Sequence, residues 1–246
     1  MPDDGFKFFD EIDSTNSYCI REAAELASGT VVVADRQTAG KGRMGRTWQS
    51  PPGVNLYASI ILKPPFMNMG ITLFPQVAAL AVYNTVREYG VDQAWIKWPN
   101  DIHVNVAKLA GVLSENRVTN NVTEAVVVGI GVNVNMAAAD MADIGRPATS
   151  ILVETGRRID RDDFLVSVFK VFNRLYASVQ NHGFSQLHSE WKGASRLLDR
   201  RVRLLTTDKE VHGVVTDFGR DGSIEMRLHT GETTVYYSGD VSLVLE

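Results

Sequence analysis

A glycine-rich basic segment, Gly40 to Trp48, limits the folds open to this chain more than any other feature. Its glycines at 40, 42 and 45 satisfy the pattern G-x-G-x-x-G. In a dinucleotide-binding fold a helix must follow at once, with an acidic residue about 20 residues later. Here Pro51-Pro52-Gly53 blocks a helix, and no Asp or Glu occurs between Arg46 and Glu88. The sequence therefore excludes a Rossmann site. It also excludes a Walker A loop, because no Gly-Lys-Ser/Thr follows at the required spacing.

The same segment is typical of an anion-binding loop. Glycines let backbone N–H groups approach an oxyanion closely, and Lys41, Arg43 and Arg46 place three cations within six residues. Arginine offers a planar fork that suits phosphate or carboxylate. A solvated basic surface loop explains the composition equally well, and Trp48 suits either stacking on a base or packing in a core. The segment alone leaves these interpretations open.

Composition places the chain among globular proteins with one large domain, or one large and one small. It has 246 residues, of which 44% are hydrophobic and 22% are charged. No apolar run approaches the roughly 18 residues that span a bilayer, and the acidic N-terminus lacks the layout of a signal peptide. The single cysteine, Cys19, cannot form an intrachain disulfide, which favours the cytoplasm. The net charge of −4 argues against a nucleic-acid backbone as the main partner.

Hydrophobic periodicity predicts an α+β fold. We expect helices from the N-cap cluster Asp13–Asn16 to Ser28, over 73–89 and over 162–179. We expect strands over 6–12, 30–36, 54–62, 94–98, 108–118 and 124–134, with a short alternating piece over 102–106. Strands interleaved with few helices favour a mostly antiparallel or mixed sheet.

The pattern changes near residue 196. Short strands are expected at 202–205, 211–217, 224–228, 234–237 and 241–245, separated by turn signals. This spacing predicts a small all-β barrel. We therefore divide the chain into domains 1–196 and 197–246.

Three further motifs carry polar groups or glycines at strand positions. Asp101 follows the strand end Lys97-Trp98-Pro99-Asn100, where an Asp usually bonds a turn but also suits Mg²⁺ or a ribose hydroxyl. Lys108 begins a strand, where most lysines are solvated. Gly129 and Gly131 lie inside a β-rich run and indicate either a bulge or the close approach of another group. The five histidines are not at zinc-ligand spacing, and no G-x-S-x-G elbow occurs.

Taken in order, the motifs of this chain resemble those of the biotin protein ligases. The resemblance rests on Asp13-Ser14-Thr15-Asn16, Gln37-x-Ala39-Gly40-Lys41-Gly42-Arg43-x-Gly45-Arg46-x-Trp48, Lys97–Asp101, Lys108–Glu115 and Gly129–Asn133. Ala148–Leu152 and Ser238–Val241 are similar to weaker motifs of the family. Each motif alone is modest, but five in the right order are specific and extend over nearly the whole chain.

The resemblance implies a fold, an activity and partners. The fold would be the biotin/lipoate-ligase type, a mixed sheet with helices related to class II aminoacyl-tRNA synthetases, followed by an SH3-like C-terminal barrel. The activity would be that of a biotin–[acetyl-CoA-carboxylase] ligase using ATP and Mg²⁺. Biotin would be activated to biotinyl-5′-AMP with release of pyrophosphate, and then transferred to a lysine of a biotin carboxyl carrier protein of acetyl-CoA carboxylase or a related carboxylase.

The resemblance also implies residue roles. Biotin would be bound by Ser14, Thr15, Asn16, Gln37, Gly40, Lys41, Gly42, Arg43, Lys108 and Gly111. The adenylate would be bound by Arg46, Trp48, Asn100 and Asn133. Catalysis would fall to Arg43, Lys108 and Asp101, with Asp101 holding the ATP-bound Mg²⁺ or positioning the incoming lysine. The glycine-rich loop would close over the hydrolysable anhydride and exclude water.

Two departures and two alternatives accompany the resemblance. Lys41 stands where some members carry arginine, so bidentate geometry is lost there. The motifs begin at residue 13, which implies the monofunctional form without a helix-turn-helix repressor domain and without DNA as a partner. A lipoate ligase or octanoyltransferase on the same fold competes, as does a non-enzymatic biotin sensor or RNA-binding module. The loop and the Lys97–Asp101 motif weigh against the first, and the net charge weighs against nucleic acid. Whether the chain forms a homodimer stays open.

Overall fold

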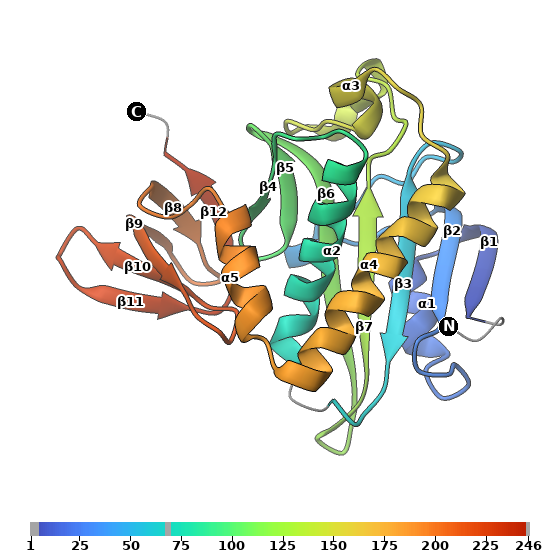
Figure 1. Cartoon of the computed structure of the whole chain (residues 1–246), viewed down its shortest axis with the longest axis horizontal. Coiled ribbons are helices and arrows are strands. Elements are labelled where there is room, and N and C mark those ends of the chain that lie inside the picture. Colours follow the sequence, from blue (N-terminus) through green and yellow to red (C-terminus); the bar gives the residue numbers. More distant parts are fainter. Residues whose placement is uncertain (1–4, 67–69, 245–246) are drawn as a thin grey trace.

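The structure, a computed structural model, describes residues 5–66 and 70–244. Its larger sheet has seven strands in the order β1-β2-β3-β7-β6-β5-β4 (Figure 1). The strands are β1 (Phe6–Ile12), β2 (Val31–Gln37), β3 (Leu56–Leu62), β4 (Ala94–Lys97), β5 (Asp101–Val104), β6 (Ala107–Thr119) and β7 (Val122–Val132). Only the β1–β2 pairing is parallel, and the other pairings in this sheet are antiparallel. The predicted mixed sheet is confirmed.

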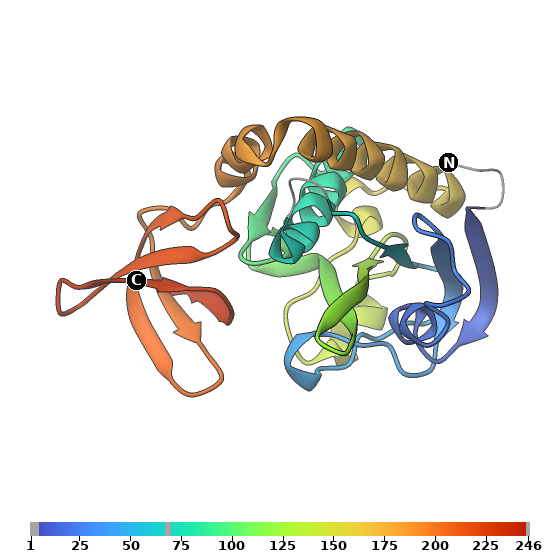
Figure 2. The same ribbon diagram turned by 90° about the horizontal axis from the view of Figure 1, so that it is seen from below.

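Helices cover the two faces of this sheet unequally. The long helices α2 (Phe74–Glu88) and α4 (Arg161–His182) lie on one face, and the short α1 (Thr15–Arg21) lies on the other (Figure 2). Successive strand residues point to opposite faces. Ile60 and Ile130 therefore join the large core beneath α2 and α4, whereas Ile61 and Val127 join a smaller core with Cys19 of α1. The α1 side leaves part of the sheet uncovered, and the site lies there.

Helix α1 is shorter than predicted. It ends at Arg21 instead of continuing to Ser28. Arg117 of β6 donates from Nη1 to the carbonyls of Ile20 and Arg21, at 2.8 and 3.4 Å. These bonds satisfy carbonyls at the end of the helix that further turns would otherwise have occupied. Tertiary contact thus ends a helix that local propensity would continue.

The structure contains two helices that the periodicity did not predict. Helix α3 (Ile151–Thr155) begins at Ser150, whose Oγ accepts a hydrogen bond from the N–H of Val153 at 3.1 Å. Helix α5 (Ser185–Ala194) buries Leu187 and Trp191 at four-residue spacing. Three 3₁₀ turns complete the helical elements, at Arg43–Gly45, Ile71–Leu73 and Ala139–Ile144. None of the helices in the described ranges is long and apolar enough to cross a membrane.

The C-terminal strands form a separate five-stranded antiparallel sheet in the order β11-β10-β9-β8-β12. They are β8 (Arg201–Leu205), β9 (Glu210–Phe218), β10 (Ile224–Leu228), β11 (Thr233–Tyr236) and β12 (Asp240–Leu243). All five predicted strands are confirmed, although Leu245 of the last one lies outside the described residues. Within residues 197–244, β11 and β12 are not paired with each other, so the sheet is open rather than a closed barrel. The indole N–H of Trp98 donates to the carbonyl of Gly222 at 2.9 Å and ties this sheet to the larger one.

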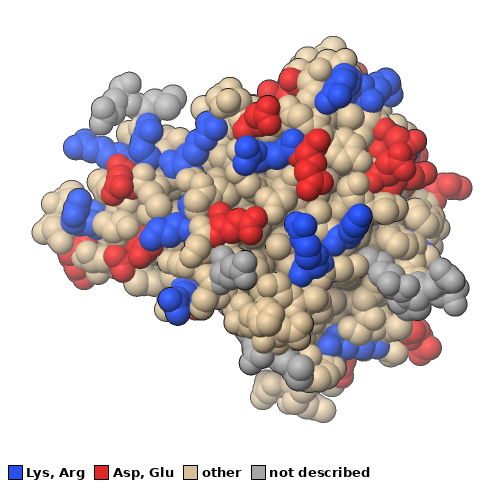
Figure 3. Space-filling view, viewed as in Figure 1, with Lys and Arg blue, Asp and Glu red and all other residues tan. Residues whose placement is uncertain are grey.

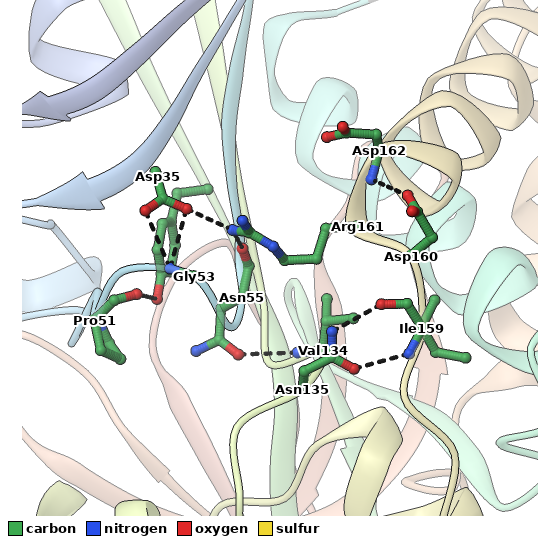
Figure 4. A network of polar contacts seen from close by, with 11 residues as sticks. Asp35, Pro51, Gly53, Asn55, Val134, Asn135, Ile159, Asp160, Arg161 and Asp162 are labelled. Carbon is green, nitrogen blue, oxygen red and sulfur yellow. Dashed lines mark hydrogen bonds and ion pairs between the residues drawn. The ribbon is translucent and has the colours of Figure 1, made fainter.

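A polar network fixes the chain just after the glycine-rich loop (Figure 4). Arg161, at the start of α4, donates from Nη1 to Asp35 of β2 at 2.8 Å and to the carbonyl of Asn55 at 3.2 Å. The Asp35 carboxylate also accepts the N–H of Gly53 at 3.0 Å. The Oδ1 of Asn55 accepts the N–H of Val134 at 3.0 Å. The segment that leaves the loop is therefore anchored to both β2 and α4.

We expect Asp35→Ala to lower the free energy of unfolding by about 1–2 kcal/mol, because it leaves the Gly53 N–H and the Arg161 guanidinium without their acceptor. Urea denaturation of the purified variant measures this change. The matched control is Asp10→Ala, which removes an exposed carboxylate from neighbouring β1 and should stay within about 0.5 kcal/mol of wild type. Equal losses in the two variants would contradict an anchoring role for Asp35.

Candidate functional site

Three glycines remove the side chain at three positions on one face of the central strands. Gly111 of β6 and Gly131 of β7 are cross-strand partners, and Gly129 lies two residues before Gly131. A Cβ on Gly131 would lie 2.6 Å from the Trp48 ring, and a Cβ on Gly111 would lie 2.9 Å from Lys108 Nζ. A Cβ on Gly129 would overlap the side chain of Asn16. The close-approach interpretation of Gly129 and Gly131 is confirmed.

Hydroxyl and amide groups line one end of the cleft above this floor. Ser14 is the N-cap of α1, and the N–H of Thr15 donates to Gln37 Oε1 at 2.9 Å. Ser59 Oγ of β3 lies 2.6 Å from Asn16 Oδ1 and 2.7 Å from Thr15 Oγ1. Ser14, Thr15, Asn16 and Ser59 are all buried. This end of the cleft can therefore present several neutral donors and acceptors in fixed positions.

Glu115 of β6 joins this end of the cleft to the glycine-rich loop. Its Oε2 accepts from Asn16 Nδ2 at 2.8 Å, and its Oε1 lies 3.5 Å from Lys41 Nζ. The loop itself is a tight hairpin in which the N–H of Gly42 donates to Arg46 at 2.7 Å. Met44 and Gly45 both have positive φ, at 56° and 71°, which reverses the chain at the tip. The prediction of an irregular segment here is confirmed.

An ion pair occupies the middle of the cleft. Lys108 Nζ lies 2.7 Å from Asp101 Oδ2, and the two side chains are 15% and 20% exposed. Burial raises the pKa of the Asp101 carboxyl, but the Lys108 ammonium outweighs burial and holds that pKa below its usual value. Lys108 Nζ also lies 5.3 Å from the centroid of the Trp48 ring, in cation–π geometry. Lys108 is thus buried and paired, and the interpretation of a solvated lysine is wrong.

A second carboxylate, Asp240 of β12, brings the C-terminal sheet to the cleft. Its two oxygens contact Arg46 Nη1 at 2.6 Å and Lys97 Nζ at 3.1 Å. Burial raises the pKa of Asp240, but Lys97 and Arg46 more than offset burial and lower the pKa to about 2. Asp240 is therefore ionised at neutral pH and holds two cations from distant segments together.

A wider cleft adjoins the first one and shares its cations. Trp48, Lys108, Arg46, Arg146 and Asp240 line both clefts. The first cleft has a cavity volume of about 60 Å³ and the second about 600 Å³. The arrangement is a narrow polar pocket, a junction rich in positive charge, and a roomy second compartment.

The structure brings most of the predicted site residues together. The first cleft is lined by Ser14, Thr15, Asn16, Gln37, Lys41, Gly42, Arg43, Arg46, Trp48, Asp101, Lys108 and Gly111, and Asn133 lines the second. Gly40 and Asn100 line neither cleft. Gly40 lies at the base of the loop, where a Cβ would overlap the carbonyl of Trp48. Asn100 is buried behind the site, where it donates to the carbonyl of Val112 and accepts from Arg43 at 3.4 Å.

Several residues at the clefts were not predicted. Arg146 follows Gly145 in an irregular segment, where no spacing pattern marks a site. Ser59 and Glu115 line neither cleft but bond the Asn16 side chain from β3 and β6, where nothing in the sequence distinguishes them from other strand residues. Asp240 had one signal, the turn Ser238-Gly239-Asp240, but nothing in the sequence indicates that it faces Arg46 across the chain.

The sequence of this chain matches a known family and proteins named as its members. The sequence profile of the biotin/lipoate A/B protein ligase family matches residues 8–133. The bifunctional ligase/repressor BirA of Bacillus subtilis is 32% identical over 96% of this chain and 73% of its own length. The biotin–[acetyl-CoA-carboxylase] ligase of Paracoccus denitrificans is 32% identical over 91% of this chain and 94% of its own length.

A solved structure extends the similarity to the whole fold. The biotin protein ligase of Aquifex aeolicus in complex with biotin and ATP superposes with a TM-score of 0.85 at 28% identity, covering 98% of this chain and 99% of that one. Fold and site thus define a protein ligase with a cation-lined junction between two compartments. The chain belongs to the biotin/lipoate A/B protein ligase family.

We expect Gly131→Ala to fold but to displace Trp48, because the added methyl group would lie 2.6 Å from the indole ring. The readout is ¹⁹F NMR of protein labelled with 5-fluorotryptophan, which has four tryptophans to report. The Trp48 resonance should shift while the other three stay in place. The control is Gly193→Ala in α5, where a Cβ meets open space. It should leave all four resonances unchanged and raise stability by up to about 1 kcal/mol. An unmoved Trp48 signal in Gly131→Ala would contradict the close contact.

Asp240 predicts a specific pH dependence of stability. A carboxylate whose pKa falls from 3.8 to about 2 on folding stabilises the native state above pH 3.8, and this stabilisation disappears as pH falls toward 2. Asp240→Asn should therefore be less stable than wild type by about 2–3 kcal/mol at pH 7 and nearly equal to it at pH 2. Urea unfolding at several pH values measures the difference. Asp208→Asn, an exposed site in the turn between β8 and β9, should show no such trend. A constant difference across this pH range would exclude the ion pairs as its cause.

Proposed function

We propose that this chain is an ATP-dependent biotin protein ligase, which activates biotin as biotinyl-5′-AMP and transfers it to a lysine of a biotin carboxyl carrier protein. The observation that carries the proposal is the charged junction at Lys108, where a narrow hydrogen-bonding pocket meets an open compartment. The similarity over nearly the full chain to a ligase bound to biotin and ATP supports it.

The narrow pocket suits the head group of biotin. A neutral bicyclic ligand needs close walls with a few polar groups that fix its orientation. Ser14, Thr15, Asn16 and Gln37 supply hydroxyls and amides at the inner end, where the Asn16 side chain lies against Gly129. The carboxylate of the ligand would then point toward Arg43 and Lys108. Lys41, Gly42 and Gly111 line the path between the two ends.

Activation requires positive charge rather than a protein nucleophile. An oxygen of the biotin carboxylate attacks the α-phosphorus of ATP, and the bond to the pyrophosphate breaks as pyrophosphate leaves with the electron pair. Negative charge grows on the phosphoryl oxygens, and fixed cations that face it are the largest expected catalytic contribution. Lys108 and Arg43 are the cations placed for this, with Lys108 held in position by Asp101.

The adenylate would occupy the wider compartment. Trp48 forms the wall between the two clefts, and Asn133 and Arg46 line the second. Within the described ranges no group of three His, Cys, Asp or Glu residues forms a metal cage, so Mg²⁺ would arrive on the phosphates of ATP. Asp101 is the residue that would hold it. The ion would neutralise part of the polyphosphate charge.

Transfer completes the reaction. The neutral ε-amine of the acceptor lysine attacks the carboxyl carbon of the mixed anhydride. The bond between that carbon and the phosphate oxygen breaks, AMP leaves with the electron pair, and the nitrogen releases one proton to water as the amide forms. The glycine-rich loop, with Arg43 on its inner side, would act as a lid that keeps water from the anhydride.

Four further features belong to the proposal. The five-stranded sheet is the SH3-like module, with the domain boundary at residue 197. The enzyme works in the cytoplasm, which the single cysteine supports. DNA is not a proposed partner. On the face shown in Figure 3, Lys and Arg are interspersed with Asp and Glu and form no continuous basic surface. Net charge is −4.

Biotin-dependent exchange of pyrophosphate into ATP tests the proposed function. The exchange should require biotin, and lipoate or octanoate should not replace it. Biotin transfer to the carrier domain of an acetyl-CoA carboxylase should follow. Exchange that depends on lipoate would identify the protein as a lipoate ligase instead. Biotin binding without exchange would identify a sensor.

We expect Lys108→Met to slow single-turnover formation of biotinyl-AMP by roughly 10- to 150-fold, the effect of losing a charged hydrogen bond of about 1.5–3 kcal/mol. The variant should also be less stable, because Asp101 stays buried without its partner. The double variant Lys108→Met with Asp101→Asn separates the two effects. It should recover stability in urea denaturation but not the rate. A rate within twofold of wild type in Lys108→Met would remove Lys108 from the reaction centre.

A further inference from the structure

A third groove opens beside the reaction centre, between the start of α2, the Pro99–Asn100 turn and the C-terminal sheet. Its cavity volume is about 220 Å³. Arg43 and Leu113 line both this groove and the narrow cleft, so the two spaces adjoin at these side chains. Neither the head-group pocket nor the adenylate compartment of the proposed function uses it.

The groove presents one buried hydrogen-bond acceptor without a donor among the described residues, Gln76 Oε1, and one exposed carboxylate, Asp221. The Oε1 of Gln76 in α2 is buried and, within the described ranges, has no hydrogen-bond partner, and Gln76 as a whole is only 4% exposed. Buried amide oxygens without a donor are rare in folded proteins. In the turn that lies against Gln76, Asp221 is exposed, and its hydrogen bond from Ser223 Oγ at 2.6 Å lowers the pKa of its carboxyl. Arg43 makes the end next to the narrow cleft positive, so the part of the groove at Gln76 and Asp221 is the part that favours a ligand with N–H donors or positive charge.

Tyr237 gives the same groove an apolar surface. Its side chain lies between β11 and β12 at the rim and is 68% exposed. An exposed tyrosine offers a rigid ring on which an aliphatic stem can pack. A carboxylate beside such a ring matches the two parts of a lysine side chain, the ammonium group and its four-carbon stem.

We propose that this groove receives the lysine-bearing segment of the carrier protein and is the path by which the acceptor amine reaches the reaction centre. The proposal rests on the proposed function, since it assigns the entry of its second substrate. Asp221 attracts the ammonium group, Tyr237 packs against the stem, and Gln76 Oε1 accepts an N–H from the segment. The C-terminal sheet thereby recognises the carrier, in addition to supplying Asp240 to the junction.

The test separates docking from chemistry with two acceptors for one intermediate. Biotinyl-AMP is formed on the enzyme and is then reacted either with the carrier domain of an acetyl-CoA carboxylase or with hydroxylamine, a small amine that needs no docking. The variants are Tyr237→Ala and Asp221→Asn, whose amide oxygen can still accept the N–H of Ser223 at 3.1 Å. The control is Asp208→Asn, another exposed acid of the C-terminal sheet.

For each groove variant we expect the carrier concentration at half-maximal transfer to rise about 5- to 30-fold, as for a hot-spot contact. Pyrophosphate exchange, thermal stability and the hydroxylamine rate should stay within twofold of wild type, and Asp208→Asn should match wild type throughout. Unchanged carrier dependence in both variants would overturn the proposal. Equal decreases in the rates of reaction with the carrier and with hydroxylamine would also overturn it, because the groove residues would then act in the reaction itself rather than in docking. A wild-type protein with no biotin-dependent exchange would instead refute the proposed function itself.

Discussion

Bare backbone on one face of β6 and β7 is the constraint on which the site depends. The side chains of Lys108, Asn16 and Trp48 can lie against the sheet because the residues beneath them, Gly111, Gly129 and Gly131, have no side chain. The opposite face of the same strands is ordinary core, with Val112 and Ile130 packed beneath α2 and α4. Because successive residues alternate between faces, one pair of strands can carry the binding cleft on one face and the hydrophobic core on the other.

Carboxylates hold the cations of the cleft in positions where they can bind an anion. The cations of the junction would repel one another if they were gathered alone, and the fold separates them with single carboxylates. Asp101 pairs with Lys108, Glu115 with Lys41, and Asp240 with both Arg46 and Lys97. A positive site of this kind is ordered before its ligand arrives, so binding need not include the cost of arranging it.

The sequence predicts the sheet and most of the site because both depend on local pattern. Alternation in Leu56–Leu62 marks a strand, and the glycines at 129 and 131 mark a close approach before its partner is known. The failures share one cause, which is contact between distant segments. Arg117 ends α1 early, and Asp240 meets Arg46 across most of the chain. Asn100 differs in another way. It lies in a motif that we expected to contribute to the adenylate site, but its side chain lines neither cleft and instead accepts a hydrogen bond from Arg43. No short segment of the sequence contains both partners of these contacts.

Asp240 also has a consequence for how the enzyme is made. A ribosome completes the sheet, the glycine floor and the loop long before it adds the strand that carries this carboxylate. Until then Arg46 and Lys97 lack the partner that orders them. The order of synthesis thus delays the assembled junction until β12 has been made. A nascent chain that does not yet contain β12 lacks this carboxylate, so assembly of the junction depends on synthesis of β12.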